Sequence, residues 1–170
     1  MAAGLGFVTE DRKNQGLVLD LSVRENITLP AVPTVGRSGV VAGKTEKNLV
    51  ARFIEQLKIR TRDAELEVKS LSGGNQQKVV LAKWLALKPR VLILDEPTRG
   101  VDIGGKAEIY HIINQLAAEG MAVLVISSEL PEVLGISDRI VVMHEGRVAG
   151  ELATATATQE AVMHLATGGQ

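Results

Sequence analysis

The chain has 170 residues and is 45% apolar, so it is long enough and apolar enough to bury the core of one domain. Its net charge of −1 provides no general attraction to nucleic acid or to anionic lipid. The lack of cysteine excludes disulfides, thiolate zinc sites and thiol catalysis. No apolar run is long enough for a membrane helix, and no export signal is recognisable. We therefore expect a globular protein with none of these features.

The first half of the chain is predicted to contain one strand and two helices. Residues 5–9 resemble a strand, and residues 30–44 are too rich in proline and glycine for a regular element. Apolar residues at helical spacing predict helices over 45–58 and 75–87, and Pro89 ends the second.

The second half is predicted to alternate strands and helices. The apolar runs 91–94, 122–126 and 139–143 indicate strands buried on both faces of a parallel sheet. Between the first two runs, isoleucine and leucine recur at helical spacing, and Gly120 is suited to end that helix. This order predicts a β-α-β crossover.

A hairpin and a short helix are expected near the C-terminus. Pro131 suits the first turn of a helix, and HEGR at 144–147 predicts a turn into a strand at 148–152. The fold class is therefore α/β with an antiparallel edge. The predicted division is an α/β core made of 1–21 and 89–170, and a helical subdomain over 22–88.

The segment LSGGNQQK at 71–78 directly precedes a predicted helix. Free backbone N–H groups and the positive end of the helix dipole meet at Ser72, Gly73 and Gly74, where a phosphate would be stabilised. The glycines allow close approach of an anion, and the serine hydroxyl can donate to a phosphate oxygen. The alternative is an ordinary helix start with Ser72 as its N-cap.

The segment VLILDEP at 91–97 places two carboxylates at the carboxyl end of a strand, where open α/β sheets bind ligands. Asp95 can hold hydrated Mg²⁺ on nucleotide phosphates, and Glu96 can orient or deprotonate an attacking water. The alternative is a turn that merely follows a strand. Asp102 and the cluster 127–129 also lie just beyond predicted elements, which is consistent with one rim of functional loops.

In order and spacing, LSGGNQQK and VLILDEP resemble the signature and Walker B motifs of the ATP-binding cassette (ABC) family. More narrowly, the chain resembles the second cassette of bacterial importers of ribose, galactose or xylose, in which two cassettes are fused. The segments that carry this resemblance are TEDRKNQGL at 9–17, SVREN at 22–26, NQQK at 75–78 and TRGVD at 98–102. The resemblance covers essentially the whole chain and implies a P-loop NTPase-like cassette fragment with a helical subdomain.

The resemblance also implies roles for individual residues. Glu10 stands at the position of the Q-loop glutamine and Ser128 at that of the switch histidine, so we expect the chain's own site to bind nucleotide without efficient turnover. The signature would instead bind the γ-phosphate of ATP held mainly by a partner cassette. The implied residues are Glu96, Ser128 and Glu10 for catalysis, Ser72, Gly73, Gly74 and Asp102 for ATP, and Asp95 for Mg²⁺.

One family motif is missing from this sequence. No G-x-x-x-x-G-K-[ST] occurs, and the nearest imitation, Gly43-Lys44-Thr45, has Ser38 where the first glycine is required. Thr45 is therefore expected to be a helix N-cap. We expect a cassette that lacks its phosphate loop through truncation or a misassigned start, and an isolated chain that is inactive.

The resulting functional hypothesis is the ATP-binding subunit of a sugar importer at the cytoplasmic face of the bacterial inner membrane. Its expected partners are a second, fused cassette, transmembrane permease subunits and, indirectly, a periplasmic sugar-binding protein. Residues 10–13 would meet the permease, or would form a solvated charged turn. Three alternatives stay open: a silent module that supplies only the signature and an allosteric interface, a soluble cassette ATPase, and a small-molecule kinase using Gly43-Lys44-Thr45.

Overall fold

The computed structural model describes residues 4–31, 36–37, 40–41 and 43–169. The chain divides into two units, Met1–Ile126 and Ser127–Gln170, and each is described by itself. No helix within the described ranges has the length and apolar character needed to cross a membrane.

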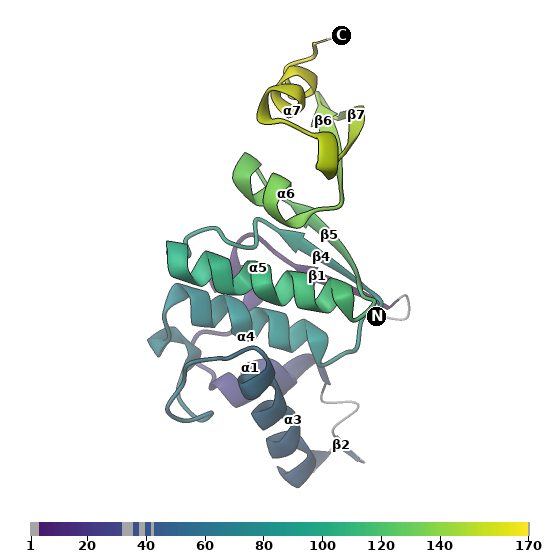
Figure 1. Ribbon diagram of the computed structural model, residues 1–170. Coiled ribbons are helices and arrows are strands. Elements are labelled where there is room, and N and C mark those ends of the chain that lie inside the picture. The colour runs from purple at the N-terminus through teal and green to yellow at the C-terminus, as the bar shows by residue number, and fades with distance from the viewer. Residues whose placement is uncertain (1–3, 32–35, 38–39, 42, 170) are drawn as a thin grey trace. The chain divides into compact units, whose positions relative to one another are not determined.

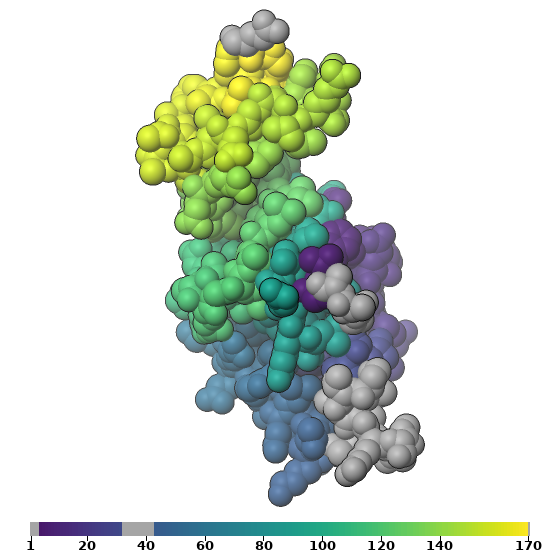
Figure 2. All heavy atoms as spheres, turned by 90° about the vertical axis from the view of Figure 1, so that its right-hand side faces the viewer, coloured from purple at the N-terminus to yellow at the C-terminus, as the bar shows by residue number. Residues whose placement is uncertain are grey.

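The sheet of the first unit is parallel, with strand order β1-β4-β5 (Figure 1). Its strands are β1 (Leu5–Val8), β4 (Val91–Asp95) and β5 (Ala122–Ile126). In Figure 2 the purple start of the described chain lies against teal residues, as the pairing of β1 with β4 requires. The predicted strands and the crossover between β4 and β5 are confirmed.

Helices cover one face of this sheet. The helices α4 (Gly73–Leu85) and α5 (Ile103–Ala118) lie along it (Figure 1). From β1 and β4, the side chains of Val8, Leu92 and Leu94 are buried in the core. On the other face, large apolar residues of β1 and β5 are between 42% and 54% exposed; they are Leu5, Phe7, Leu124 and Ile126. The prediction that β5 is buried on both faces is therefore wrong, because it is an edge strand and one face lies open among the described residues.

The helical segment before α4 begins with a helix that sequence analysis did not predict, α1 (Val23–Thr28). It packs against α4 and α3 (Gly43–Gln56), and Arg24 donates to Glu46 of α3 at 2.9 Å. Because α3 begins at Gly43, Thr45 lies inside its first turn, and its prediction as an N-cap is wrong. Shorter helical turns are Arg12–Gly16, which lies before α1, Leu29–Ala31, which follows α1, and Val68–Ser70, which lies before α4.

The predicted loop over 30–44 contains a small paired element. The strands β2 (Gly36–Arg37) and β3 (Val40–Val41) pair antiparallel, so the prediction of a loop without regular structure is wrong for these residues. Gly36 is the partner of Val41 and Arg37 that of Val40, a pairing that a composition rich in turn formers does not reveal. Ser38 lies outside the described residues.

The second unit is a hairpin packed against short helices. β6 (Arg139–His144) pairs antiparallel with β7 (Arg147–Ala153), and Glu145 and Gly146 take positive φ in the turn. The hairpin prediction is confirmed, but among the described strands β6 pairs only with β7, so the prediction that it joins the parallel sheet is wrong. The other elements are α6 (Leu130–Ile136), the turn Thr154–Thr156 and α7 (Gln159–Ala166).

This unit has a core of its own, centred on Ile140, Val142 and Val162. Sequence analysis draws no boundary at residue 126. The division into 1–21 with 89–170, and 22–88, stays a prediction.

Candidate functional site

The signature turn, residues 72–74, starts helix α4 without a side-chain cap. Ser72 has N-cap backbone angles, φ −62° and ψ 157°, but its hydroxyl accepts no helix N–H. Instead, the hydroxyl accepts a hydrogen bond from the Asn75 side chain at 2.9 Å. The first turn of α4 also contains no acidic residue. The turn therefore offers its N–H groups and the helix dipole to an outside acceptor.

Gly73 is packed so closely that it has no room for a side chain. A Cβ at this position would lie 2.8 Å from Nη2 of Arg12 and 2.9 Å from the Gly100 carbonyl oxygen. Gly100 itself has φ +65°, a conformation that favours glycine. The signature turn thus rests directly on the backbone of residues 99–101, which we name the 99–101 loop.

Lys78, the last residue of the octapeptide, anchors α4 to α5. Its side chain is buried, and Nζ donates to Glu108 Oε2 at 2.7 Å and to the Lys58 carbonyl at 3.0 Å. The hydrogen bond from Lys78 lowers the pKa of Glu108 below its ordinary value. This ion pair fixes the helix whose first residues form the signature turn.

Asp95 and Glu96 stand at the carboxyl end of β4, the central strand of the sheet. Glu96 has φ +46°, and its N–H donates to the Ile126 carbonyl of β5 at 2.9 Å. A non-glycine residue in this region is strained, and such strain gathers at functional sites. The two carboxylates supply oxygen ligands of the kind that Mg²⁺ binds together with nucleotide phosphates. The described residues contain no cluster of three or more metal-binding side chains.

Glu10 and Asp102 flank the same 99–101 loop. Glu10 follows β1 and pairs with Arg99. Asp102 caps helix α5 by accepting a hydrogen bond from the Gly105 N–H at 2.8 Å. The first unit thus brings the signature turn, Glu10 and the segment 95–102 into one connected arrangement. Ser128 belongs to the second unit, where it is exposed.

Sequence reasoning placed Arg12 only in the segment 10–13 expected to meet the permease, and it missed the contact of this side chain with the 99–101 loop. Its guanidinium donates to the carbonyl oxygens of Arg99 and Gly100 at 2.5 and 3.1 Å. Burial lowers the pKa of Arg12, while neighbouring Asp11 acts in the opposite direction; an arginine remains protonated at neutral pH. The signal available in the sequence was a basic residue just beyond a parallel strand, on the edge where ligands bind.

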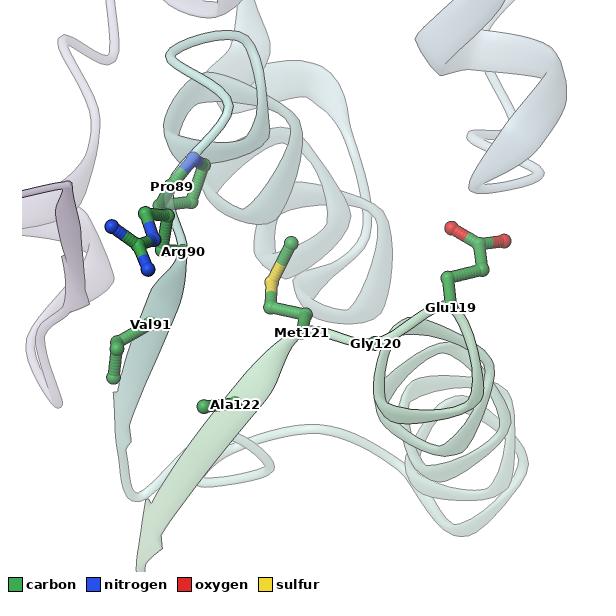
Figure 3. Close-up of a pocket in the computed structure, with 7 residues that line it drawn as sticks. All are labelled: Pro89, Arg90, Val91, Glu119, Gly120, Met121 and Ala122. Carbon is green, nitrogen blue, oxygen red and sulfur yellow. The ribbon is translucent and has the colours of Figure 1, made fainter.

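A cavity of about 590 Å³ lies at the opposite, amino end of β4 and β5. In Figure 3 the side chains of Arg90 and Glu119 stand on either side of it, with Met121 between them. None of the predicted site residues lines this cavity. The chemistry of the motifs is therefore concentrated at the carboxyl end of the sheet.

Residues 2–99, more than half of the chain, match the ABC transporter family. The chain belongs to this family. It is 65% identical, over 99% of its length, to the ribose import ATP-binding protein RbsA of Chromobacterium violaceum, and 55% identical over 98% to that of Bacillus subtilis. It spans about a third of the length of these relatives, 34% in both cases.

Solved structures agree with the family. The dimeric, post-hydrolysis state of the ATP-binding cassette MJ0796 bound to ADP and Pi is similar with a TM-score of 0.74 at 25% identity, over 88% of this chain and 62% of that one. The structure of cbiO1 from Clostridium perfringens, part of the ABC transporter complex cbiONQ, has a TM-score of 0.77 at 26% identity, over 96% of this chain and 62% of that one. The predicted family and α/β cassette fold are confirmed.

Proposed function

We propose that this chain is an ATP-binding portion of a bacterial importer of ribose or a related monosaccharide. In this proposal, its signature turn binds the γ-phosphate of ATP held mainly by a second cassette. The names of the relatives support the sugar class. The observation that carries the proposal is the uncapped start of α4, where a glycine without room for a side chain leaves the backbone N–H groups accessible.

The signature turn would act as an electrostatic clamp. Backbone N–H groups and a helix dipole that are already oriented stabilise phosphate charge without reorganising during the reaction. The burial of Gly74 and the Lys78–Glu108 pair behind it support this rigidity. ATP would therefore be bound between the two cassettes, with the second cassette making most of the contacts and this chain contacting the γ-phosphate.

The chain's own carboxylates would serve a second nucleotide site. Asp95 would hold Mg²⁺, which supplies neutralisation of phosphate charge, and Glu96 would orient the attacking water. Because Glu10 and Ser128 replace the glutamine and histidine of active cassettes, we expect this site to bind nucleotide without efficient turnover. Asp102 would complete the nucleotide contacts between the cassettes.

The proposal includes partners and a place in the cell. The second cassette would be fused to this one in the full-length protein, and transmembrane permease subunits would receive the closing motion of the pair. A periplasmic sugar-binding protein would deliver the sugar. The complex would place this chain at the cytoplasmic face of the inner membrane.

The test uses this chain together with a cassette that carries G-x-x-x-x-G-K-[ST]. We expect this chain alone to hydrolyse Mg²⁺-ATP no faster than a buffer blank, and the mixture to exceed the second cassette alone by about tenfold or more, because the clamp completes the composite site. A mixture that equals the sum of its parts would contradict the proposal. Turnover by this chain alone that is abolished by Glu96→Gln would contradict the assignment of a weak own site.

A further inference from the structure

Arg12 lies in a turn whose backbone is locked. The turn Arg12–Gly16 follows Asp11, whose carboxylate accepts the Asn14 N–H at 3.1 Å and its side-chain amide at 2.7 Å. These bonds hold the start of the turn just beyond β1. The Arg12 side chain is thereby directed toward the 99–101 loop.

The guanidinium of Arg12 holds two successive carbonyl groups. Nη1 donates to the Arg99 oxygen at 2.5 Å and Nη2 to the Gly100 oxygen at 3.1 Å. A planar fork with several donors suits two adjacent acceptors, whereas the ammonium of lysine is a compact point charge. The contact between Glu10 and the Arg99 side chain ties the same loop to the same segment a second time.

These carbonyls adjoin the signature turn. The Gly100 carbonyl oxygen would lie 2.9 Å from a Cβ on Gly73. The negative end of this carbonyl dipole therefore lies beside the uncapped N–H groups of α4. An unengaged carbonyl at this place could accept those N–H groups and cap the helix internally. It would also repel a phosphate.

We propose that Arg12 is a positioning residue that engages the carbonyls of the 99–101 loop and so keeps the signature turn open for phosphate. It acts through the loop and not by contacting the ligand. The phosphate part rests on the proposed function, while the holding of the loop does not. Loss of Arg12 would release the loop and allow it to cap the turn.

The first measurement is amide hydrogen exchange on the chain and three variants: Arg12→Lys, Arg12→Gln and the control Lys13→Gln. Lys13 is the exposed neighbour of Arg12, and its side chain makes no hydrogen bond or ion pair with other described residues. The probes are the N–H groups of Arg99 and Val101, which donate to the carbonyl oxygens of Glu96 and Thr98 just before the loop, both at 3.1 Å.

We expect exchange at both probes to be about tenfold faster in the two Arg12 variants and unchanged in Lys13→Gln. Amides of the core strand β4 should keep their rates, which separates local release from global unfolding. Unchanged probes would overturn the proposal, as would acceleration that is uniform across β4 or rescue by Arg12→Lys.

The second measurement is ATP turnover in the mixture of two cassettes. We expect both Arg12 variants to lower kcat about tenfold or more with KM for ATP unchanged, because the partner holds most of the nucleotide. Equal turnover in wild type and Arg12→Gln would overturn the phosphate part. If the wild-type mixture shows no stimulation, the proposed function fails, and the exchange rates still decide whether Arg12 holds the loop.

Discussion

Helices α1 and α4 start with the same residue and nearly the same backbone, yet they treat their free N–H groups differently. Ser22 has φ −66° and ψ 164°, and Ser72 has φ −62° and ψ 157°. The Ser22 hydroxyl accepts the Glu25 N–H at 3.1 Å, and the Glu25 carboxylate accepts the Ser22 N–H at 2.8 Å. Within the described part of the chain, the Ser72 hydroxyl accepts a hydrogen bond only from the Asn75 side chain.

The difference follows from the residue three positions after the serine and from the surroundings. Glu25 closes a capping box at α1, whereas Asn75 at α4 directs its amide to the serine hydroxyl. At α1 the capping box satisfies free N–H groups of the helix start, and this contributes to stability. At α4 they stay accessible, and the glycines and the 99–101 loop shape the space in front of them.

The largest expected effect is that of Gly73→Asp at the accessible helix start. The new side chain collides with Arg12 and the Gly100 carbonyl, and its carboxylate repels phosphate. We expect ATP turnover in the cassette mixture to fall about 100-fold or more. Steady-state turnover at saturating ATP measures this loss.

The matched control is Gly43→Asp, which changes the same residue type at the first position of α3. Among the described residues a Cβ there meets nothing within 4 Å, so turnover should be unchanged. A loss of turnover in Gly43→Asp would revive the kinase alternative.

Glu96→Gln should lower ATP turnover in the mixture less than Gly73→Asp does, because Glu96 belongs to the weaker site. Equal losses would count against this asymmetry.

The next effect concerns stability and separates the two serines. Ser22→Ala removes a buried cap and should lower the free energy of unfolding by about 1 kcal/mol. Ser72→Ala removes no cap and should change it by less than about 0.5 kcal/mol. Urea unfolding of both variants measures the difference. Equal destabilisation would show that Ser72 also caps its helix.

The smallest expected effect is in the pH dependence of the stability that each helix start contributes. Hydrogen bonds from the Ser22 backbone N–H and hydroxyl lower the pKa of Glu25 below its ordinary value of 4.5. The capping box therefore contributes stability above pH 4.5 and loses it as pH falls through the lowered pKa. We expect the carboxyl pKa of Glu25, followed by NMR, to rise in Ser22→Ala.

The start of α4 provides the control for this titration. It has no acidic residue in its first turn, so Ser72→Ala should leave the pH dependence of the free energy of unfolding between about pH 5 and pH 3 unchanged, whereas Ser22→Ala should weaken it. An equal change in both variants would contradict the comparison.

The features that could be predicted from sequence depend on neighbours in the chain. Strands β1, β4 and β5 follow from short apolar runs, and the β6–β7 hairpin follows from its turn residues. The signature turn, Asp95 and Glu96 could be predicted as site residues because each belongs to a contiguous motif. In each case, the pattern that indicates the element or motif lies within a few residues of sequence.

The remaining features depend on segments that are distant in sequence. The six-residue helix α1 is too short to show a clear period, and its stability comes from its capping box and from packing on α4 and α3. The separate core around Ile140, Val142 and Val162 depends on which surfaces meet. Strand patterns do not say which strand pairs with which.

Arg12 shows the same limit at the candidate site. The sequence by itself determined the α/β alternation, the signature turn and the carboxylates at the end of β4. Only the tertiary structure decided that Arg12 reaches carbonyls 87 and 88 residues away and that these carbonyls adjoin Gly73. The physical reason is that backbone carbonyls are present at every residue, so a contact with them leaves no trace in side-chain pattern or spacing.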